Sequence, residues 1–259
     1  MIAPNINEIE IRGGMTKAGQ KEMIQELSIR TGEVVALVGP TGSGKSMLLS
    51  DIEQMAAADT PTGRIVTIKR REGGDMKQRM IAQLSQTMNF VIDMEVAEFL
   101  SLHASSQRIT DGTIVDKVIA LANSLAGEPI TPNTEMTTLS GGQSRALMVA
   151  DIAIISDSPI VLIDEIENAG IDRLKALEIL SAQGKIVIIA SHDPMIILRS
   201  DKRIAMRDGG MTQISITQDG ERRLLEQLII WDKQVVALRE ALRNGGTISI
   251  CLEGALSCV

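Results

Sequence analysis

The feature that most constrains this chain is a glycine-rich segment that directly follows five apolar residues, Val34 to Val38. The segment is a complete G-x-x-x-x-G-K-S phosphate loop, Gly39-Pro40-Thr41-Gly42-Ser43-Gly44-Lys45-Ser46. The pattern predicts a buried strand, a tight turn and a helix from about Lys45 to Ala57, whose first backbone N–H groups would bind an anion. Lys45 would reach the β- and γ-phosphates, and Ser46 would ligate Mg²⁺. A turn that merely joins a strand to a helix needs neither side chain, so we expect a nucleoside triphosphate site.

A second glycine-rich motif precedes an apolar helical run from Ala146 to Ile155. It reads Leu139-Ser140-Gly141-Gly142-Gln143. A serine hydroxyl and two glycine amides at the start of a helix form another anion-binding nest. Alone, the motif could be an ordinary turn and helix cap. Because one protein does not need two nests for one triphosphate, we expect this second nest to have a role of its own.

Two further apolar segments each end in polar residues suited to catalysis. Ile160 to Ile163 leads into Asp164-Glu165, and Lys185 to Ala190 leads into Ser191-His192-Asp193. In an open parallel sheet such residues meet at the carboxyl edge, where ligands bind. Asp164 would hold Mg²⁺ through Ser46 or water, and Glu165 is placed to polarise an attacking water as a general base. The alternative is a strand end capped by solvated acids.

In this order, the motifs resemble those of the ATP-binding cassette (ABC) family over roughly residues 5–216. The resemblance implies an α/β P-loop NTPase fold with a parallel central sheet, an N-terminal antiparallel β subdomain and a helical subdomain at about 88–150. It also implies a head-to-tail dimer, in which Ser140 to Gln143 of one subunit close over ATP bound by the other. We expect residues 1–216 to form this ATPase domain and residues 217–259 a C-terminal extension.

The resemblance assigns two more catalytic positions. His192 corresponds to the switch histidine that touches the γ-phosphate. Gln86 corresponds to a glutamine that contacts the metal and water, although Gln83 stands only three residues away. The chain's other histidine, His103, lies in a helical stretch, and we expect it simply at the surface.

Several positions depart from the family pattern. No Phe, Tyr, Trp or His precedes residue 90, so the aromatic that usually stacks on adenine is missing, and Arg12 or Met15 could cover the base instead. Met47 stands where the family usually has a threonine that touches the α-phosphate. Asp151 stands where transporters commonly carry arginine.

The segment after Glu165 also departs from the family. It has no proline and is one residue longer than usual, and its sequence is similar to that of overcoming-lysogeny-type and related non-transport ATPases. We take Asp172 as the aspartate of the D-loop. The segment reads Ile166-Glu167-Asn168-Ala169-Gly170-Ile171-Asp172.

Composition limits the function classes. The chain has 259 residues and a net charge of −7, which suits one large α/β domain and argues against nucleic-acid binding, because phosphate neutralisation needs clustered Lys and Arg. No stretch approaches the ~20 apolar residues of a membrane span, and the N-terminus lacks a signal pattern. Cys251 and Cys258 fit free thiols in a reducing compartment. We expect a cytoplasmic protein, or one held peripherally at the inner face of the cell membrane.

The last forty or so residues contain one amphipathic helix. Gly245-Gly246 would end this helix, and a short strand would follow from Thr247 to Leu252. The helix either folds back on the ATPase domain, which we expect, or docks a partner. Its apolar stripe consists of Leu224, Leu228, Trp231, Val235, Leu238 and Leu242.

Three functions remain open, each using ATP and Mg²⁺. The first is the energising subunit of a membrane transporter, docked on a permease through the cleft between Gln86 and Val96; most of the family serves transport. The second is a soluble ATPase in cofactor assembly, protein activation or repair, favoured by the altered D-loop and the missing aromatic. A scaffold without turnover is disfavoured because Glu165 and His192 are both present. The expected partner is a second ABC subunit, identical or different, together with a permease or a soluble protein.

Overall fold

The computed structural model describes residues 6–70, 80–85, 90–164, 171–246, 248–250 and 256–258. The chain divides into two compact units, Met1–Ile216 and Thr217–Val259. The first unit contains all the motifs described above, and the second contains the C-terminal helix.

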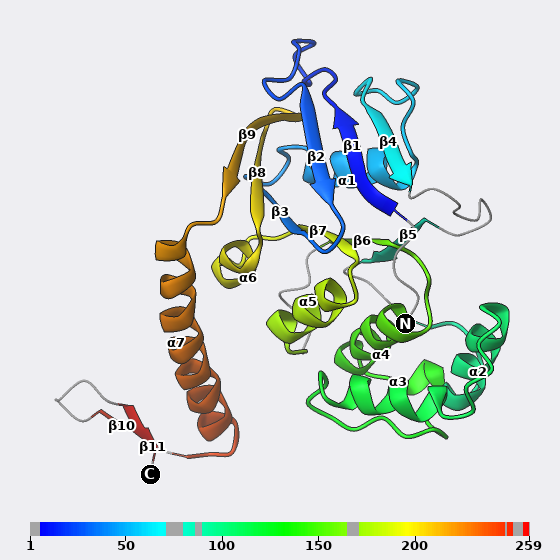
Figure 1. Ribbon diagram of the computed structural model, residues 1–259. Helices are drawn as coiled ribbons and strands as arrows, with labels where there is room; N and C mark the ends of the chain where they lie inside the picture. The colour runs from blue at the N-terminus through cyan, green and yellow to red at the C-terminus, as the bar shows by residue number, and fades with distance from the viewer. Residues whose placement is uncertain are drawn as a thin grey trace. The chain divides into compact units, whose positions relative to one another are not determined.

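A six-stranded sheet forms the centre of the first unit, in the order β5-β6-β7-β3-β8-β9 (Figure 1). Neighbouring strands are parallel except for β9, which runs antiparallel to β8. The strands β3, β6 and β7 are buried almost throughout, as expected for a parallel sheet covered on both faces. The α/β fold class predicted from the sequence is confirmed. The strands are β3 (Val34–Val38), β5 (Ile81–Leu84), β6 (Ile160–Asp164), β7 (Ile186–Ala190), β8 (Lys202–Arg207) and β9 (Gly210–Ile216).

A smaller antiparallel sheet, in the order β2-β1-β4, packs beside it. Its strands are β1 (Ile6–Arg12), β2 (Glu26–Arg30) and β4 (Ile65–Arg70). Alternate residues of these strands point inward and share one hydrophobic core with helix α1 (Lys45–Glu53) and strand β3. Lys69 lies within β4 and pairs with Glu8 and Glu10 of β1.

Helix α1 ends earlier than the predicted boundary at Ala57. It stops at Glu53, and Met55 and Ala58 adopt positive φ angles of 53° and 63°. The Ala56 carbonyl accepts the N–H of Val66 at 2.7 Å, so the chain has already turned toward β4. Pairing with a distant strand therefore overrides the local helical preference.

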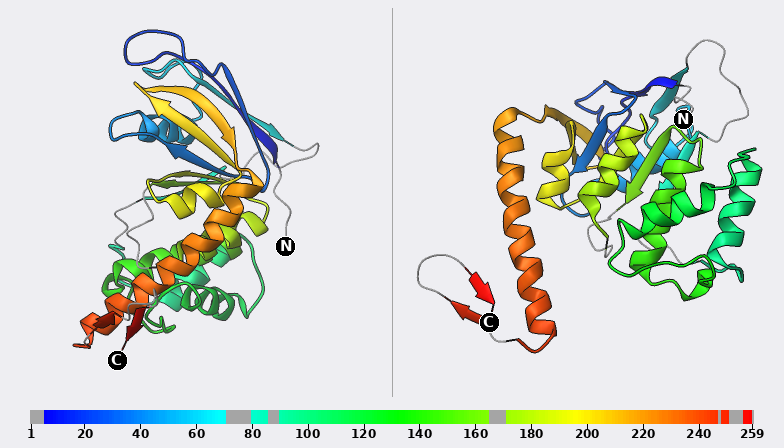
Figure 2. Two further views of the ribbon diagram at one scale, coloured as in Figure 1. Left: turned by 90° about the vertical axis from the view of Figure 1, so that its left-hand side faces the viewer. Right: turned by 60° about the horizontal axis from the view of Figure 1, so that its bottom comes forward.

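The helical part of the first unit surrounds a second hydrophobic core. Helices α2, α3 and α4 gather at one end of the central sheet, away from the antiparallel sheet (Figure 2). This group begins at Val96 and carries the second glycine-rich motif at the start of α4. The elements are α2 (Val96–Ser106), α3 (Ile114–Asn123), a 3-10 turn η1 (Met136–Thr138), α4 (Gly141–Ile154), α5 (Arg173–Ala182) and α6 (Pro194–Arg199).

A fully buried arginine ties three segments of the first unit together. The side chain of Arg64 is 0% exposed and pairs with Glu22, in the β1–β2 connection, at 2.7 Å and with Asp51, in α1, at 2.8 Å. Its Nη2 also donates to the carbonyl of Gly209, in the β8–β9 turn, at 2.6 Å. Because buried charges are costly unless paired, this cluster fixes the three segments relative to one another.

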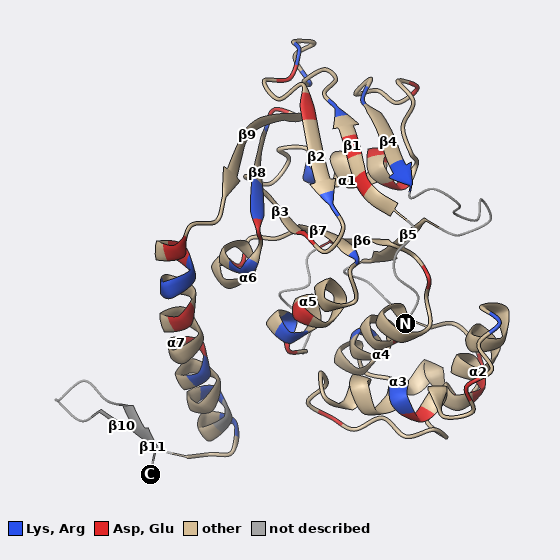
Figure 3. Cartoon of the chain, in the orientation of Figure 1, with Lys and Arg blue, Asp and Glu red and all other residues tan. Residues whose placement is uncertain are grey.

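The second unit consists of helix α7 (Asp219–Arg243) and a hairpin of β10 (Ile248–Ile250) and β11 (Leu256–Cys258). Acidic and basic residues alternate along α7 (Figure 3). Trp231 is 57% exposed and Leu242 is 54% exposed, so the apolar stripe is not buried within its own unit. The expectation that this stripe packs against the ATPase domain stays a prediction. Among the helices of the described ranges, none combines the length and apolar character needed to cross a membrane.

Candidate nucleotide-binding site

The phosphate loop connects β3 to α1 and is packed tightly against the β8–β9 region. Gly39, Gly42 and Gly44 have φ angles of 146°, 78° and 103°, which favour glycine. A Cβ at Gly44 would lie 2.7 Å from the Cα of Gly209, and one at Gly39 would lie 2.4 Å from the carbonyl oxygen of Met206. Glycine is therefore needed in the loop for two reasons: it adopts these φ angles, and it leaves room for the close contact with the β8–β9 region.

The ammonium group of Lys45 lies against this loop. Its side chain donates to the carbonyl oxygens of Gly39, at 2.7 Å, and Pro40, at 3.3 Å. Its Nζ also lies 3.2 Å from Nε2 of His192, which follows strand β7. The residue is largely buried without a carboxylate contact among the described residues, an arrangement that suits an anionic ligand.

An open pocket of about 220 Å³ lies in front of the loop. Most of its residues belong to the phosphate loop and the start of α1, while Asp164 ends β6 and His192 follows β7, so the pocket lies at the carboxyl edge of the parallel strands, as predicted. The Ser43 hydroxyl, at the loop, is buried and has no hydrogen-bond partner within the described part of the chain. The lining residues are Lys17, Thr41, Gly42, Ser43, Gly44, Lys45, Ser46, Met47, Asp164 and His192.

These residues fit a magnesium nucleotide. Ser46, which is exposed, and Asp164, at the end of β6, both line the pocket. Within the described ranges, no group of three or more His, Cys, Asp or Glu side chains is placed to hold a metal ion. Mg²⁺ typically takes one or two protein oxygens and completes its shell with phosphate and water. A hydroxyl and one carboxylate beside a phosphate loop match that requirement.

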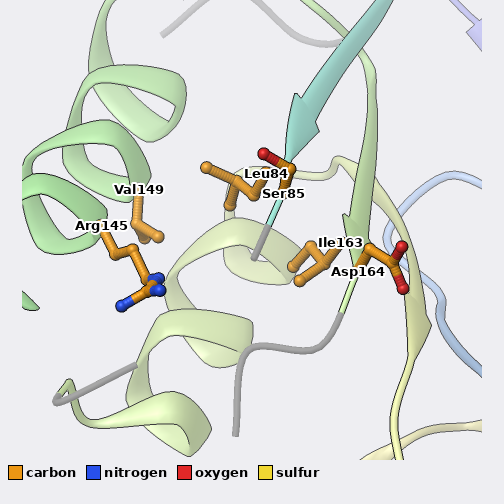
Figure 4. A pocket seen from close by; sticks show the side chains of 6 residues that line it. All are labelled: Leu84, Ser85, Arg145, Val149, Ile163 and Asp164. Carbon is orange, nitrogen blue, oxygen red and sulfur yellow. The ribbon is translucent and has the colours of Figure 1, made fainter. Parts of the chain in front are cut away.

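Asp164 also marks the boundary of a second, mostly apolar cavity between α4 and the strands β5 and β6. In Figure 4, Arg145 extends toward this cavity from α4, whereas the carboxylate of Asp164 points away from it. The same residue also lines the phosphate-loop pocket. Glu165, the next residue, and Gln86 both lie outside the described residues. The cavity is lined by Leu84, Ser85, Arg145, Val149, Ile163 and Asp164.

The second glycine-rich motif forms the N-terminus of α4. Ser140 accepts the N–H of Gln143 at 3.3 Å, and Gln143 Oε1 accepts the N–H of Ser140 at 2.9 Å, which is a reciprocal capping box. Gln143 also donates to the Pro129 carbonyl at 3.0 Å. Ser140 and Gly141 are exposed, and neither lines the phosphate-loop pocket. Their predicted role toward another subunit's ATP stays a prediction.

Three other predicted residues lie outside the pocket lining. Asp172 caps helix α5, accepting the N–H of Lys175 at 3.0 Å. Arg12 ends strand β1, and Met15 forms an isolated bridge with Lys21. Lys17, by contrast, lines the pocket, although it belongs to none of the sequence motifs. In the sequence, its only link to the nucleotide is that it lies close to Met15, in the segment where the family usually has the aromatic residue that stacks on adenine.

Sequence comparison relates this chain to known proteins. Residues 24–168 match the sequence profile of the family described as ABC transporter. An uncharacterized ABC transporter ATP-binding protein of Methanocaldococcus jannaschii is 52% identical over 247 residues, which cover 93% of this chain and 94% of that protein. The chain belongs to the ABC transporter family. The family resemblance drawn from the motifs is thereby confirmed.

More distant members of the ABC family extend the comparison. The macrolide export ATP-binding/permease protein MacB of Campylobacter jejuni is 27% identical over 82% of this chain, which spans only 34% of MacB. The solved structure of cbiO1 from Clostridium perfringens, part of the ABC transporter complex cbiONQ, covers 91% of this chain with a TM-score of 0.62. At 19% identity that likeness supports the ABC ATPase fold alone.

One expectation about this ABC protein is wrong. His103 is not simply a surface residue, because its Nδ1 lies 2.7 Å from Oδ1 of the nearly buried Asp151. The two residues join α2 to α4 within the helical part. Asp151, which stands where the family pattern led us to expect arginine, therefore has a histidine as its partner across the helix pair.

Proposed function

We propose that this ABC protein binds ATP with Mg²⁺ in the phosphate-loop pocket and hydrolyses it to ADP and phosphate. The single observation that carries the proposal is the arrangement of Lys45, Asp164 and His192 in one pocket, at the ends of three neighbouring parallel strands or their loops. A cation, a carboxylate and an imidazole placed around an anion nest are the groups needed to hold and cleave a polyphosphate.

Each residue has a distinct role in this proposal. The loop from Gly39 to Met47 binds the phosphates through its backbone N–H groups, and Lys45 neutralises the β- and γ-phosphates. Ser46 and Asp164, together with Gln86, would hold Mg²⁺, which offsets phosphate charge. Glu165 orients and deprotonates the attacking water, and His192 contacts the γ-phosphate.

We infer that two subunits form the complete site. Ser140, Gly141, Gly142 and Gln143 of one copy would contact the triphosphate bound by the other, and Asp172 would lie at the same interface. The exposure of Ser140 and Gly141, and their place outside the copy's own pocket, support this assignment. The second copy is either identical or another ABC subunit.

We propose that hydrolysis energises a transporter. The relatives named as ABC transporter ATP-binding proteins support this role, and they do not favour the soluble alternative in cofactor assembly, protein activation or repair. MacB is named as an ATP-binding/permease protein, and this chain spans about a third of it, so a permease is the proposed partner. This would place the protein peripherally at the inner face of the cell membrane.

The test measures phosphate release and ATP binding by the purified chain and two variants. Lys45→Ala should lose nucleotide binding, whereas Glu165→Gln should bind Mg-ATP but lose about 10²- to 10⁴-fold in turnover. Wild-type turnover by Glu165→Gln would remove this residue from the general-base role. Co-purification with an integral membrane protein supports the transporter role, and a soluble enzyme as the sole partner would contradict it.

A further inference from the structure

We propose that Lys17 is a second phosphate-binding cation of the nucleotide site, acting beside Lys45. This inference rests on the proposed ATP-binding function. Lys17 belongs to the connection between β1 and β2, far from the phosphate loop in the sequence, yet its side chain lines the same pocket. Its Nζ donates to the carbonyl oxygen of Gly42, within the phosphate loop, at 2.7 Å.

The backbone of Lys17 is fixed from both sides. Its N–H donates to the carbonyl oxygen of Asp208 at 2.8 Å, and the turn around it is closed by a hydrogen bond from Thr16 N–H to Gln20 at 2.7 Å. The stem of the side chain lies against Gly209, where an added Cβ would approach Lys17 Cγ to 2.9 Å. These contacts hold the backbone and the stem of Lys17 beside the phosphate loop, and the hydrogen bond to Gly42 directs its ammonium group toward the loop.

The buried Arg64 cluster stabilises this placement. Arg64 joins Glu22, which follows Lys17 in the same connection, to Asp51 of the phosphate-loop helix and to the Gly209 carbonyl. The same Glu22 carboxylate accepts the N–H of Met211 at 3.0 Å. The connection that carries Lys17, the helix that follows the phosphate loop and the β8–β9 turn thus form one frame.

The chemistry of this ammonium favours phosphate. Within the described part of the chain, the ammonium group of Lys17 makes no ion pair and donates a hydrogen bond to one carbonyl oxygen only, that of Gly42. A lysine carries three N–H donors, so donors remain for phosphate oxygens. Lysine is a compact point charge, without the flat surface with which an aromatic or an arginine covers a base. Affinity supplied in this way does not discriminate between bases, which fits a chain with no aromatic residue before residue 90.

The experiment compares Lys17→Met with Lys21→Met, a matched loss of one positive charge in the same connection. Binding of ADP, GDP and tripolyphosphate is measured by calorimetry, because none of them requires hydrolysis or a closed dimer. Lys17→Met should weaken all three ligands by about tenfold, as expected for a charged hydrogen bond, and Lys21→Met should change them little. Raising the salt concentration should reduce the difference in affinity between the wild type and Lys17→Met, because the site is open to solvent. Equal melting temperatures of the variants exclude misfolding as the cause.

Two results would overturn the inference. Unchanged binding by Lys17→Met would remove the residue from the site, and a loss for ADP and GDP but not for tripolyphosphate would show contact with the base or ribose. If the wild-type chain binds none of the three ligands, the proposed function fails as well. If it binds them and Lys17→Met does so equally, only the role of Lys17 fails.

Discussion

Lys45 and His192 meet at the phosphate loop, with Nζ of the lysine 3.2 Å from Nε2 of the histidine. An ammonium group has no acceptor, so this contact requires Nε2 to be the unprotonated nitrogen of the imidazole. The two residues come from helix α1 and from the loop after β7, which neighbours β3 in the sheet. Strand order therefore brings them together across a large sequence distance.

This contact predicts that His192 supports hydrolysis more than binding. In His192→Ala, Lys45 keeps its hydrogen bonds to Gly39 and Pro40, so ATP affinity should change little. Turnover should fall by about 100-fold, the typical cost of losing one group that stabilises transition-state charge. Calorimetry and phosphate release measure the two quantities separately.

His103→Gln is the control for that variant, because His103 lies in the helical part, paired with Asp151. It should keep the wild-type turnover even if the melting temperature falls. An equal loss of turnover in both histidine variants would mean that the effect of His192→Ala is structural.

Substitution of Ser140, in the exposed anion-binding nest at the start of α4, should prevent ATP-driven dimerisation. Ser140→Arg places a bulky cation where the γ-phosphate bound by the opposite subunit should lie, so ATP should no longer drive dimerisation, while the monomer still binds nucleotide. The arginine also removes the side-chain acceptor used by Gln143 N–H, so a milder variant, Ser140→Asp, keeps the helix cap and adds only a repulsive charge.

Light scattering with ATP, in the Glu165→Gln background, is the measurement for both variants. Neither should dimerise, although both should keep the helical content of the wild type. ATP-driven dimers of Ser140→Arg would contradict the head-to-tail arrangement.

The sequence predicts those parts of the fold that depend on local pattern. Apolar runs before Gly39 and after Ser158 mark β3 and β6, and the motif residues at their ends follow directly. Residues that act through long-range contacts were not predictable in the same way. The position of Lys17 depends on the β8–β9 turn, and the pairing of His103 depends on how α2 packs on α4. A pattern along one segment does not reveal which distant segment it will face.

The buried Arg64 cluster predicts a large loss of stability on mutation. Arg64→Met leaves the carboxylates of Glu22 and Asp51 buried without their cation, which should lower the free energy of unfolding by about 3–5 kcal/mol. Lys69→Met, which removes a solvent-exposed cation from the neighbouring strand β4, should have little effect. Urea unfolding measures both. Similar losses in the two variants would show that the cluster contributes no more than a surface ion pair.

The buried amine of Lys185 should make the free energy of unfolding rise with pH in the alkaline range. Its Nζ donates to the carbonyl oxygens of Ser156 and Ser158 at 2.9 and 2.8 Å, and burial lowers the pKa of this amine from 10.5 to about 8. Between these two values the unfolded chain binds more protons than the folded chain, so the free energy of unfolding increases as the pH rises through the window. Below pH 8 the cost of burying the charge is fully present, and above 10.5 it is gone.

The size of this rise is on the order of 3 kcal/mol if the residue acts alone. The chain contains no tyrosine, so one common alkaline titration does not interfere. Urea unfolding at pH 7.5, 9 and 10.5 should therefore show the rise in the wild type and in Lys117→Met, an exposed lysine of α3, but not in Lys185→Met. The comparison depends on differences between variants, so a general alkaline loss of stability cancels. A pH dependence of Lys185→Met identical to that of the wild type would show that the buried amine does not titrate in this window.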